Sequence, residues 1–199
     1  MNDHAAHANR DRDLEPAAYR VEEALRDGHP IHIRAIKADD KQRLAELHGR
    51  LSSEAIYYRF LGAKKRLTSG ELVYLTELDF HRQAALVAIL QANGSERIAG
   101  VGRYACEPGG PDDRADVALT VEDAEQGRGI GTLLLKHLMR VARAMGVTRF
   151  DAHLLSDNVR MIRLLERTGL VLDRVATGGM CHLTVSTEAA ASSFPDSSS

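Results

Sequence analysis

The feature that most constrains the fold is a glycine-rich segment between a β-branched apolar run and a long helical pattern. Residues 117–121 read VALTV, a polar turn follows, and Gly127, Gly129 and Gly131 then stand at alternate positions. Glycine permits dihedrals closed to other residues and removes the Cβ atoms that keep a ligand from the backbone. The order predicts a strand, a loop and a helix start, whose unpaired N–H groups and partial positive charge suit a phosphate or pyrophosphate.

The spacing of the loop argues against two common nucleotide-binding motifs. No lysine follows the last glycine, which weakens a nucleotide triphosphatase interpretation. The glycines are spaced G-x-G-x-G, which is not the dinucleotide-binding G-x-G-x-x-G. With Gln126 three residues before Gly129, the loop reads Q-x-x-G-x-G. By itself this loop indicates an anion site without naming the anion.

Composition bounds the class of protein. A chain of 199 residues with 44% hydrophobic residues predicts one domain, and a net charge of −2 gives no general attraction to nucleic acid. Cys106 and Cys181 are far apart in a chain with no evident signal peptide, and the apolar runs are short. We therefore expect a cytoplasmic protein with free thiols and no membrane segment. The nine histidines lack metal-ligand spacing, so no metal is expected.

The hydrophobic periodicity divides the chain into a flexible tail over residues 1–23, one domain over residues 24–186 and a disordered tail over residues 187–199. A first strand near residues 31–34 is expected to form a hairpin across Asp27-Gly28, and three short helices follow, the first capped by Asp39. The remaining elements are a hairpin around Asn93-Gly94, a strand at 115–121, a helix at 130–145, a strand at 148–155, a helix to Arg167 capped by Ser156 or Asp157, and a closing hairpin at 171–186.

Two motifs in this order resemble those of the GNAT N-acetyltransferases: Q-x-x-G-x-G, and NVRMIRLLERTGL between Asn158 and Leu170. The resemblance implies an α+β fold with a mixed, mostly antiparallel central sheet, splayed at a CoA slot and covered by helices on both faces. It also implies acetyl-CoA as co-substrate. The residues it assigns to CoA are Leu119, Val121, Gln126, Gly127, Arg128, Gly129, Ile130, Gly131, Asn158 and Arg167.

The amino-terminal half narrows the resemblance. It is similar to bacterial protein-lysine acetyltransferases that modify acyl-CoA synthetases. The residues that carry this similarity are Ser53-Glu54 with Tyr57, Arg59 and Phe60, then Leu75-Thr76, Asp79, His81, and residues 85–88 and 98–103. This implies a protein partner with a reactive lysine, such as an acyl-CoA synthetase. A small-amine acetyltransferase and a non-catalytic acyl-CoA sensor remain the alternatives.

The chemistry requires a base, because a lysine with a pKa of about 10.4 arrives protonated. Asp116 is the first choice, on a strand bordering the slot and on the same face as Thr120. Related acetyltransferases generally have Glu here, so the shorter Asp favours a water relay. Glu122 is the second choice. Many relatives place a Tyr acid where this chain has Leu165, so no side-chain acid is assigned, and a thiolate is already a good leaving group.

Overall fold

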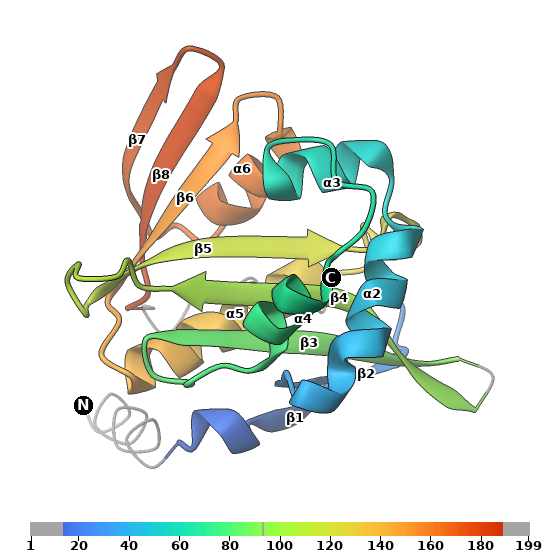
Figure 1. Ribbon diagram of the computed structural model, residues 1–199. Coiled ribbons are helices and arrows are strands. Elements are labelled where there is room, and N and C mark those ends of the chain that lie inside the picture. The colour runs from blue at the N-terminus through green and yellow to red at the C-terminus, as the bar shows by residue number, and fades with distance from the viewer. Residues whose placement is uncertain (1–13, 93, 189–199) are drawn as a thin grey trace.

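The computed structural model describes residues 14–92 and 94–188, which are built on an eight-stranded sheet (Figure 1). The strand order is β1-β2-β3-β4-β5-β6-β8-β7, and every neighbouring pair is antiparallel except β5 and β6. The strands are β1 (Arg20–Ala24), β2 (Pro30–Ala35), β3 (Gln83–Ala92), β4 (Ser95–Ala105), β5 (Arg114–Val121), β6 (Arg149–Leu155), β7 (Val171–Thr177) and β8 (Met180–Ser186).

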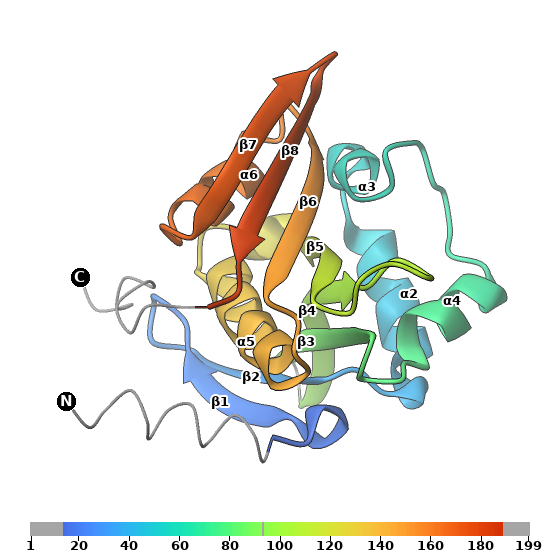
Figure 2. The ribbon, with the colours of Figure 1, turned by 90° about the vertical axis from the view of Figure 1, so that its left-hand side faces the viewer.

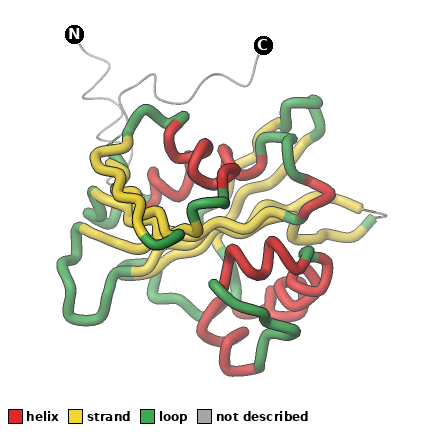
Figure 3. Tube along the Cα trace, turned by 90° about the horizontal axis from the view of Figure 1, so that it is seen from above, coloured by secondary structure: helices red, strands yellow, loops and turns green. Residues whose placement is uncertain are grey.

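Helices cover both faces of the sheet (Figures 2 and 3). One face carries α2 (Lys41–Arg50), α3 (Ser53–Phe60) and α4 (Ser69–Thr76); the other carries α5 (Ile130–Ala144) and α6 (Val159–Glu166). Short 3-10 turns occur at η1 (Pro16–Ala18), η2 (Ala38–Asp40) and η3 (Asp123–Glu125). The predicted α+β architecture, with its mixed and mostly antiparallel sheet, is confirmed.

The core lies on both sides of β3. Residues 84–90 are all buried, which is why this strand reads as a continuous apolar run and not as an alternating one. Leu86 packs with the residues beneath α5, whereas Val87 packs with those beneath α2 and α4. The sheet is therefore the middle layer of three.

The sheet opens between β5 and β6. Only three residue pairs join these parallel strands, Arg114–Asp116 with Arg149–Asp151. Beyond them β6 turns away with β8 and β7, as Figure 1 shows. The end of β5 is therefore paired with β4 on one edge and unpaired on the other, so the predicted splay is confirmed.

Two expected boundaries are wrong. The sheet begins at Arg20, within the expected tail, because β1 pairs with β2; β1 alternates between exposed and half-buried residues, so its hydrophobic pattern is weak. At the other end Thr187 is buried, its N–H donates to Thr148 O at 2.9 Å and its hydroxyl donates to Val147 O at 2.7 Å. The rest of both expected tails, residues 1–13 and 189–199, lies outside the described residues, as does Asn93 of the expected turn.

The expected cap of the first helix is also wrong, since the acid at its start is Asp40 and not Asp39. The Asp40 carboxylate accepts hydrogen bonds from both guanidinium nitrogens of Arg34, at 2.7 and 2.8 Å, and from Lys37 N–H at 2.9 Å. Asp40 is only 1% exposed. Burial raises its pKa, but these hydrogen bonds outweigh burial and hold the pKa below the ordinary 3.8. The pair fastens β2 to the start of α2.

This pair gives a stability prediction. Because the pKa of Asp40 is lowered on folding, its contribution is present above the ordinary pKa of 3.8 and is lost as the pH falls through the folded pKa. Asp40→Asn is expected to lower the free energy of unfolding by about 3 kcal/mol at neutral pH, since it leaves a mostly buried guanidinium without its carboxylate. Urea unfolding at several pH values should show the difference narrowing below about pH 3.8.

The matched control is Arg43→Gln, which removes a more exposed partner of the same carboxylate. It is expected to change stability by less than about 1 kcal/mol. A difference between wild type and Asp40→Asn that stays constant down to the acid transition would contradict the assignment.

Candidate active site

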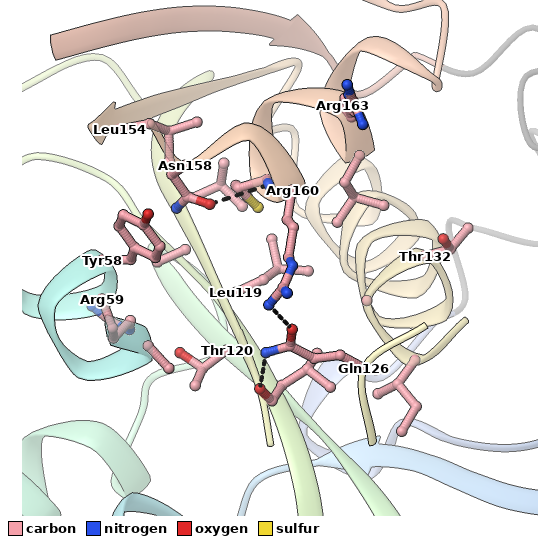
Figure 4. A pocket seen from close by; sticks show the side chains of 18 of the residues that line it. Tyr58, Arg59, Leu119, Thr120, Gln126, Thr132, Leu154, Asn158, Arg160 and Arg163 are labelled. Carbon is pink, nitrogen blue, oxygen red and sulfur yellow. Dashed lines mark hydrogen bonds between the residues drawn. The ribbon is translucent and has the colours of Figure 1, made fainter. Parts of the chain in front are cut away.

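A cavity of about 1030 Å³ lies where β5 and β6 part (Figure 4). Most of its lining comes from residues 116–121 of β5, the loop and first turn around residues 126–132, α6 and α3, and residues 151, 153 and 154 of β6 contribute as well. These segments are far apart in the sequence, and the opening of the sheet brings them together.

The glycine-rich loop presents its backbone to this cavity. Gly127 and Gly129 have φ of 83° and 97°, in the left-handed region that favours glycine, and Gly129 is the N-cap of α5. No described residue accepts a hydrogen bond from the six N–H groups of residues 127–132. Gly131 brings α6 close, since a Cβ there would lie 3.4 Å from Leu164 Cδ2. The loop is thus built as an anion-binding helix start.

The open edge of β5 continues this row of donors. Glu122 N–H donates to Ala99 O on the β4 side at 2.9 Å. Backbone groups alternate in direction along a strand, so the N–H groups of Leu119 and Val121 point to the open edge. In agreement, Val121 O accepts from Gln126 Nε2 at 3.3 Å on that edge. The residues predicted to line the slot therefore lie beside it.

Ion pairs behind the loop hold it in place. Arg128 Nε donates to Asp27 Oδ2 at 2.7 Å, and its guanidinium also binds Glu125. The hydrogen bond from Arg128 lowers the pKa of Asp27. Arg97 binds Glu125 in turn. Arg128, a predicted CoA residue, is therefore not part of the cavity lining, and its side chain supports the loop from outside the cavity.

Glu122, the second choice for a base, is engaged elsewhere. It is 7% exposed, its Oε1 lies 3.1 Å from Arg50 Nε, and its Oε2 lies 2.5 Å from Arg97 Nη1. It does not line the cavity. Two guanidinium groups hold its charge, so its carboxylate is engaged in ion pairs away from the cavity.

Asp116 lines the cavity where β5 and β6 begin to part. It is the last β5 residue that pairs with β6, and its side chain is 68% exposed. His153 Nε2 lies 3.5 Å from its Oδ1, and the His153 ring stacks on that of His182 with centroids 4.6 Å apart. His182 Nε2 in turn lies 3.1 Å from Asp151 Oδ1. A surface-accessible carboxylate with an adjacent imidazole can accept a proton from an incoming amine.

No role was predicted for His153 from the sequence. Asp116 pairs with Asp151, and His153 is two residues further along β6, so it shares a face with that partner. This proximity follows from the register of β5 against β6. The alternation of the two strands could have suggested it only if that register were known.

The start of α6 forms the opposite wall (Figure 4). Its N-cap is Asn158, and not Ser156 or Asp157; Asn158 Oδ1 accepts from Met161 N–H at 3.2 Å, which leaves the amide nitrogen for a ligand. Arg160 donates to Gln126 Oε1, so Gln126 links α6 to the end of β5. The basic side chains that line the cavity are Arg26, Arg59, Arg160, Arg163 and Arg167.

Tyr58 faces α6 across the cavity and was missed by the sequence analysis. Its hydroxyl lies 3.4 Å from both Glu54 Oε1 and Asp157 O, either of which can accept its single proton. Burial and the neighbouring acidic groups of Asp157 and Glu54 raise its pKa. The hydroxyl therefore keeps its proton and can donate it. Leu165, where relatives carry Tyr, is fully buried in the core.

Two features are absent from residues 14–92 and 94–188, the part of the chain that the structure describes. No three His, Cys, Asp or Glu side chains there are grouped as a metal ion would require. None of the helices in this part of the chain combines the length and apolar character needed to cross a bilayer.

Comparison with known proteins gives consistent matches. Residues 54–170, more than half of the chain, match the Acetyltransferase (GNAT) family. Acetyltransferase PA5475 of Pseudomonas aeruginosa is 35% identical over 126 residues, which are 62% of this chain and 66% of that protein. Acetyltransferase Pat of Mycolicibacterium smegmatis is 34% identical over 154 residues, 77% of this chain and 45% of that protein. The chain thus spans less than two thirds of either relative.

Among solved structures, the GNAT domain of S. lividans PAT is similar over almost its whole length. The TM-score is 0.78 at 34% identity, and the match covers 87% of this chain and 99% of that one. The three-layer arrangement around the open sheet is therefore shared with a protein of related sequence.

The N-cap at Asn158 gives a prediction that tests the role of its side-chain oxygen apart from that of its amide nitrogen. Asn158→Ala is expected to lower the free energy of unfolding by about 1 kcal/mol, because Met161 N–H loses its acceptor. Asn158→Asp keeps an acceptor oxygen and should stay close to wild type in urea unfolding. Equal loss of stability in both variants would mean that the oxygen does not cap α6.

Proposed function

Because the chain belongs to the GNAT family of acetyltransferases, we propose that it transfers the acetyl group of acetyl-CoA to a lysine side chain of a protein substrate. The observation that carries this proposal is the row of unpaired backbone donors that runs from the open edge of β5 into residues 127–132. An extended amide chain can pair with an open strand edge, and a pyrophosphate suits a helix start. The pantetheine arm and pyrophosphate of CoA combine both features in this order.

The remaining predicted residues fit the same ligand. Leu119 and Val121 offer N–H groups beside the pantetheine, and Asn158 offers an amide nitrogen from the facing helix. Arg160, Arg163 and Arg167 line the cavity on that helix, where their charge suits the CoA phosphates. CoA would therefore be bound between β5, the start of α5 and α6.

The chemistry is a direct transfer. Asp116, directly or through a water and with His153 beside it, removes a proton from the lysine ammonium. The amine nitrogen then attacks the thioester carbonyl carbon, and an N–H on the open edge of β5 stabilises the negative charge on the oxygen. The C–S bond breaks, and the thiolate takes up a proton, for which Tyr58, whose side chain lines the cavity, is a candidate donor.

A protein substrate is favoured by the exposure of Asp116, since a base that is 68% exposed can be reached by a lysine on a folded surface. The similarity to S. lividans PAT and to Acetyltransferase Pat supports the same class, and an acyl-CoA synthetase is the substrate we propose to test first. Acetylation of a small amine, or CoA binding without turnover, would be the competing results.

The proposed role of Asp116 as the base gives a testable prediction. With labelled acetyl-CoA and a panel of acyl-CoA synthetases, wild type should label a lysine, and Asp116→Asn should lower kcat/KM about 100-fold. His153→Gln should lower it less, because Asp116 can still act through water. Labelling of small amines alone would contradict the protein substrate, and an Asp116→Asn variant as active as wild type would contradict the base.

The proposed binding of CoA by the glycine-rich loop gives a further prediction. Gly129→Ala and Gly146→Ala both place a Cβ at positive φ, 97° and 82°, and each should cost about 1–2 kcal/mol of stability. Gly146 follows the far end of α5, so only Gly129→Ala should weaken CoA binding, by about tenfold, in calorimetry. Equal affinities in the two variants would contradict binding at this loop.

A further inference from the structure

A second, smaller cavity adjoins the first. Its volume is about 50 Å³, and it lies between α2, the end of α3, α4 and the sheet. Arg59 and Thr120 line both cavities, so the second one borders the first at the level of Thr120 on β5. Most of its lining is apolar, with His48, Arg59 and Arg103 as the ionisable side chains.

His48 is a buried polar group without a partner. It is 5% exposed, and neither ring nitrogen has a hydrogen-bond partner among the described residues. Burial lowers its pKa, so the ring is neutral near pH 7 and carries one donor and one acceptor. A buried polar atom without a partner costs free energy, which a ligand in the cavity can recover.

The guanidinium groups of Arg59 and Arg103 place positive charge on the lining of the second cavity. Arg103 is 6% exposed, and its hydrogen-bond partners are neutral: Gln83 Oε1 at 2.7 Å and Tyr74 O at 3.3 Å, with the Tyr74 ring beside it. Burial lowers the pKa of Arg103, and the nearby charge of Asp79 opposes this effect in part. Arg59 has no ion pair or hydrogen bond with the described residues, and its guanidinium lies 5.2 Å from the Phe60 ring centroid. Burial lowers the pKa of Arg59, and so does the charge of Arg103.

The charge of the lining decides what can enter. No Asp or Glu of the described chain lines the second cavity. A lysine ammonium would be repelled by the two guanidinium groups, whereas a carboxylate matches their planar donors. The cavity borders the first beside Thr120, the neighbour of Leu119, whose N–H lies along the proposed pantetheine path. A group attached to the thioester is therefore placed to reach it.

We propose that the second cavity is an anion subsite for the terminal carboxylate of a dicarboxylic acyl group, such as malonyl or succinyl, carried by CoA. The inference rests on the proposed CoA-dependent transfer and adds a donor class to the same site. Arg59 and Arg103 hold the carboxylate, and His48 donates one further hydrogen bond.

The transfer itself balances as it does for acetyl. The deprotonated amine forms a C–N bond with the thioester carbonyl carbon, the C–S bond breaks, and the CoA thiolate takes up a proton in place of the one lost by the amine. The terminal carboxylate changes no bond and keeps its charge. A lysine of charge +1 thereby becomes an amide that ends in a charge of −1.

Binding without an acceptor tests the subsite directly. Succinyl-CoA and butyryl-CoA both carry four-carbon acyl groups and differ at the terminal carboxylate. In calorimetry the wild-type chain should bind succinyl-CoA at least about tenfold more tightly, as expected for charged hydrogen bonds. Arg59→Met and Arg103→Met should each remove most of this preference, whereas Arg43→Gln, outside both cavities, should keep it.

The outcomes are distinct. Equal affinity for the two ligands in wild type would overturn the subsite, as would a preference that survives in Arg59→Met. If Arg103→Met fails to fold, the half-buried Arg59 still provides the test. Acetyl transfer to lysine without a preference for succinyl-CoA would overturn this inference alone. A preference for succinyl-CoA without transfer from any acyl-CoA would support the subsite and contradict the proposed function.

Discussion

The parting of β5 from β6 is the constraint on which the rest of the site depends. Three residue pairs hold the two strands together, and beyond them β5 keeps only its β4 neighbour. The free edge presents the N–H groups of Leu119 and Val121, and the starts of α5 and α6 both face the gap. Gln126 bridges the end of the gap, from Val121 O to Arg160. Were the two strands paired throughout, no open edge would remain.

Charge is divided along the cavity in the way a two-substrate reaction requires. Asp116 and Asp151 lie where the strands first part, and the arginines of α6 lie on the opposite wall. Near the loop, Glu125 also lines the cavity, but Arg97 and Arg128 hold its carboxylate in ion pairs that support the loop. An anionic donor and a cationic acceptor are thus directed to different parts of one cavity.

The features that could be predicted from the sequence are those that depend on backbone conformation and hydrophobic pattern within one segment. Gly127 and Gly129 adopt the positive φ expected of a glycine loop, the apolar run of β3 is buried on both faces, and the order of elements identified the fold. The hairpin expected across Asp27-Gly28 is present, but β1 starts earlier than expected, because its mostly polar residues carry little hydrophobic pattern.

Contacts between distant residues could not be predicted in this way. The pairing of Glu122 with Arg50 and Arg97, and the turning of Arg128 toward Asp27, depend on how the layers pack. The place of His153 beside Asp116 depends on strand register, and the second cavity around His48 depends on the packing of α2 and α3 on the sheet.

The central claim is that backbone donors of the loop and of the open β5 edge hold CoA. Its most direct test is a titration of ¹⁵N-labelled protein with CoA, followed by the amide resonances. The account predicts downfield proton shifts for residues 127–132 and for Leu119 and Val121, with little change at the outward-facing hairpin of β7 and β8. Saturable CoA binding that leaves the amides of residues 127–132 unshifted would contradict it.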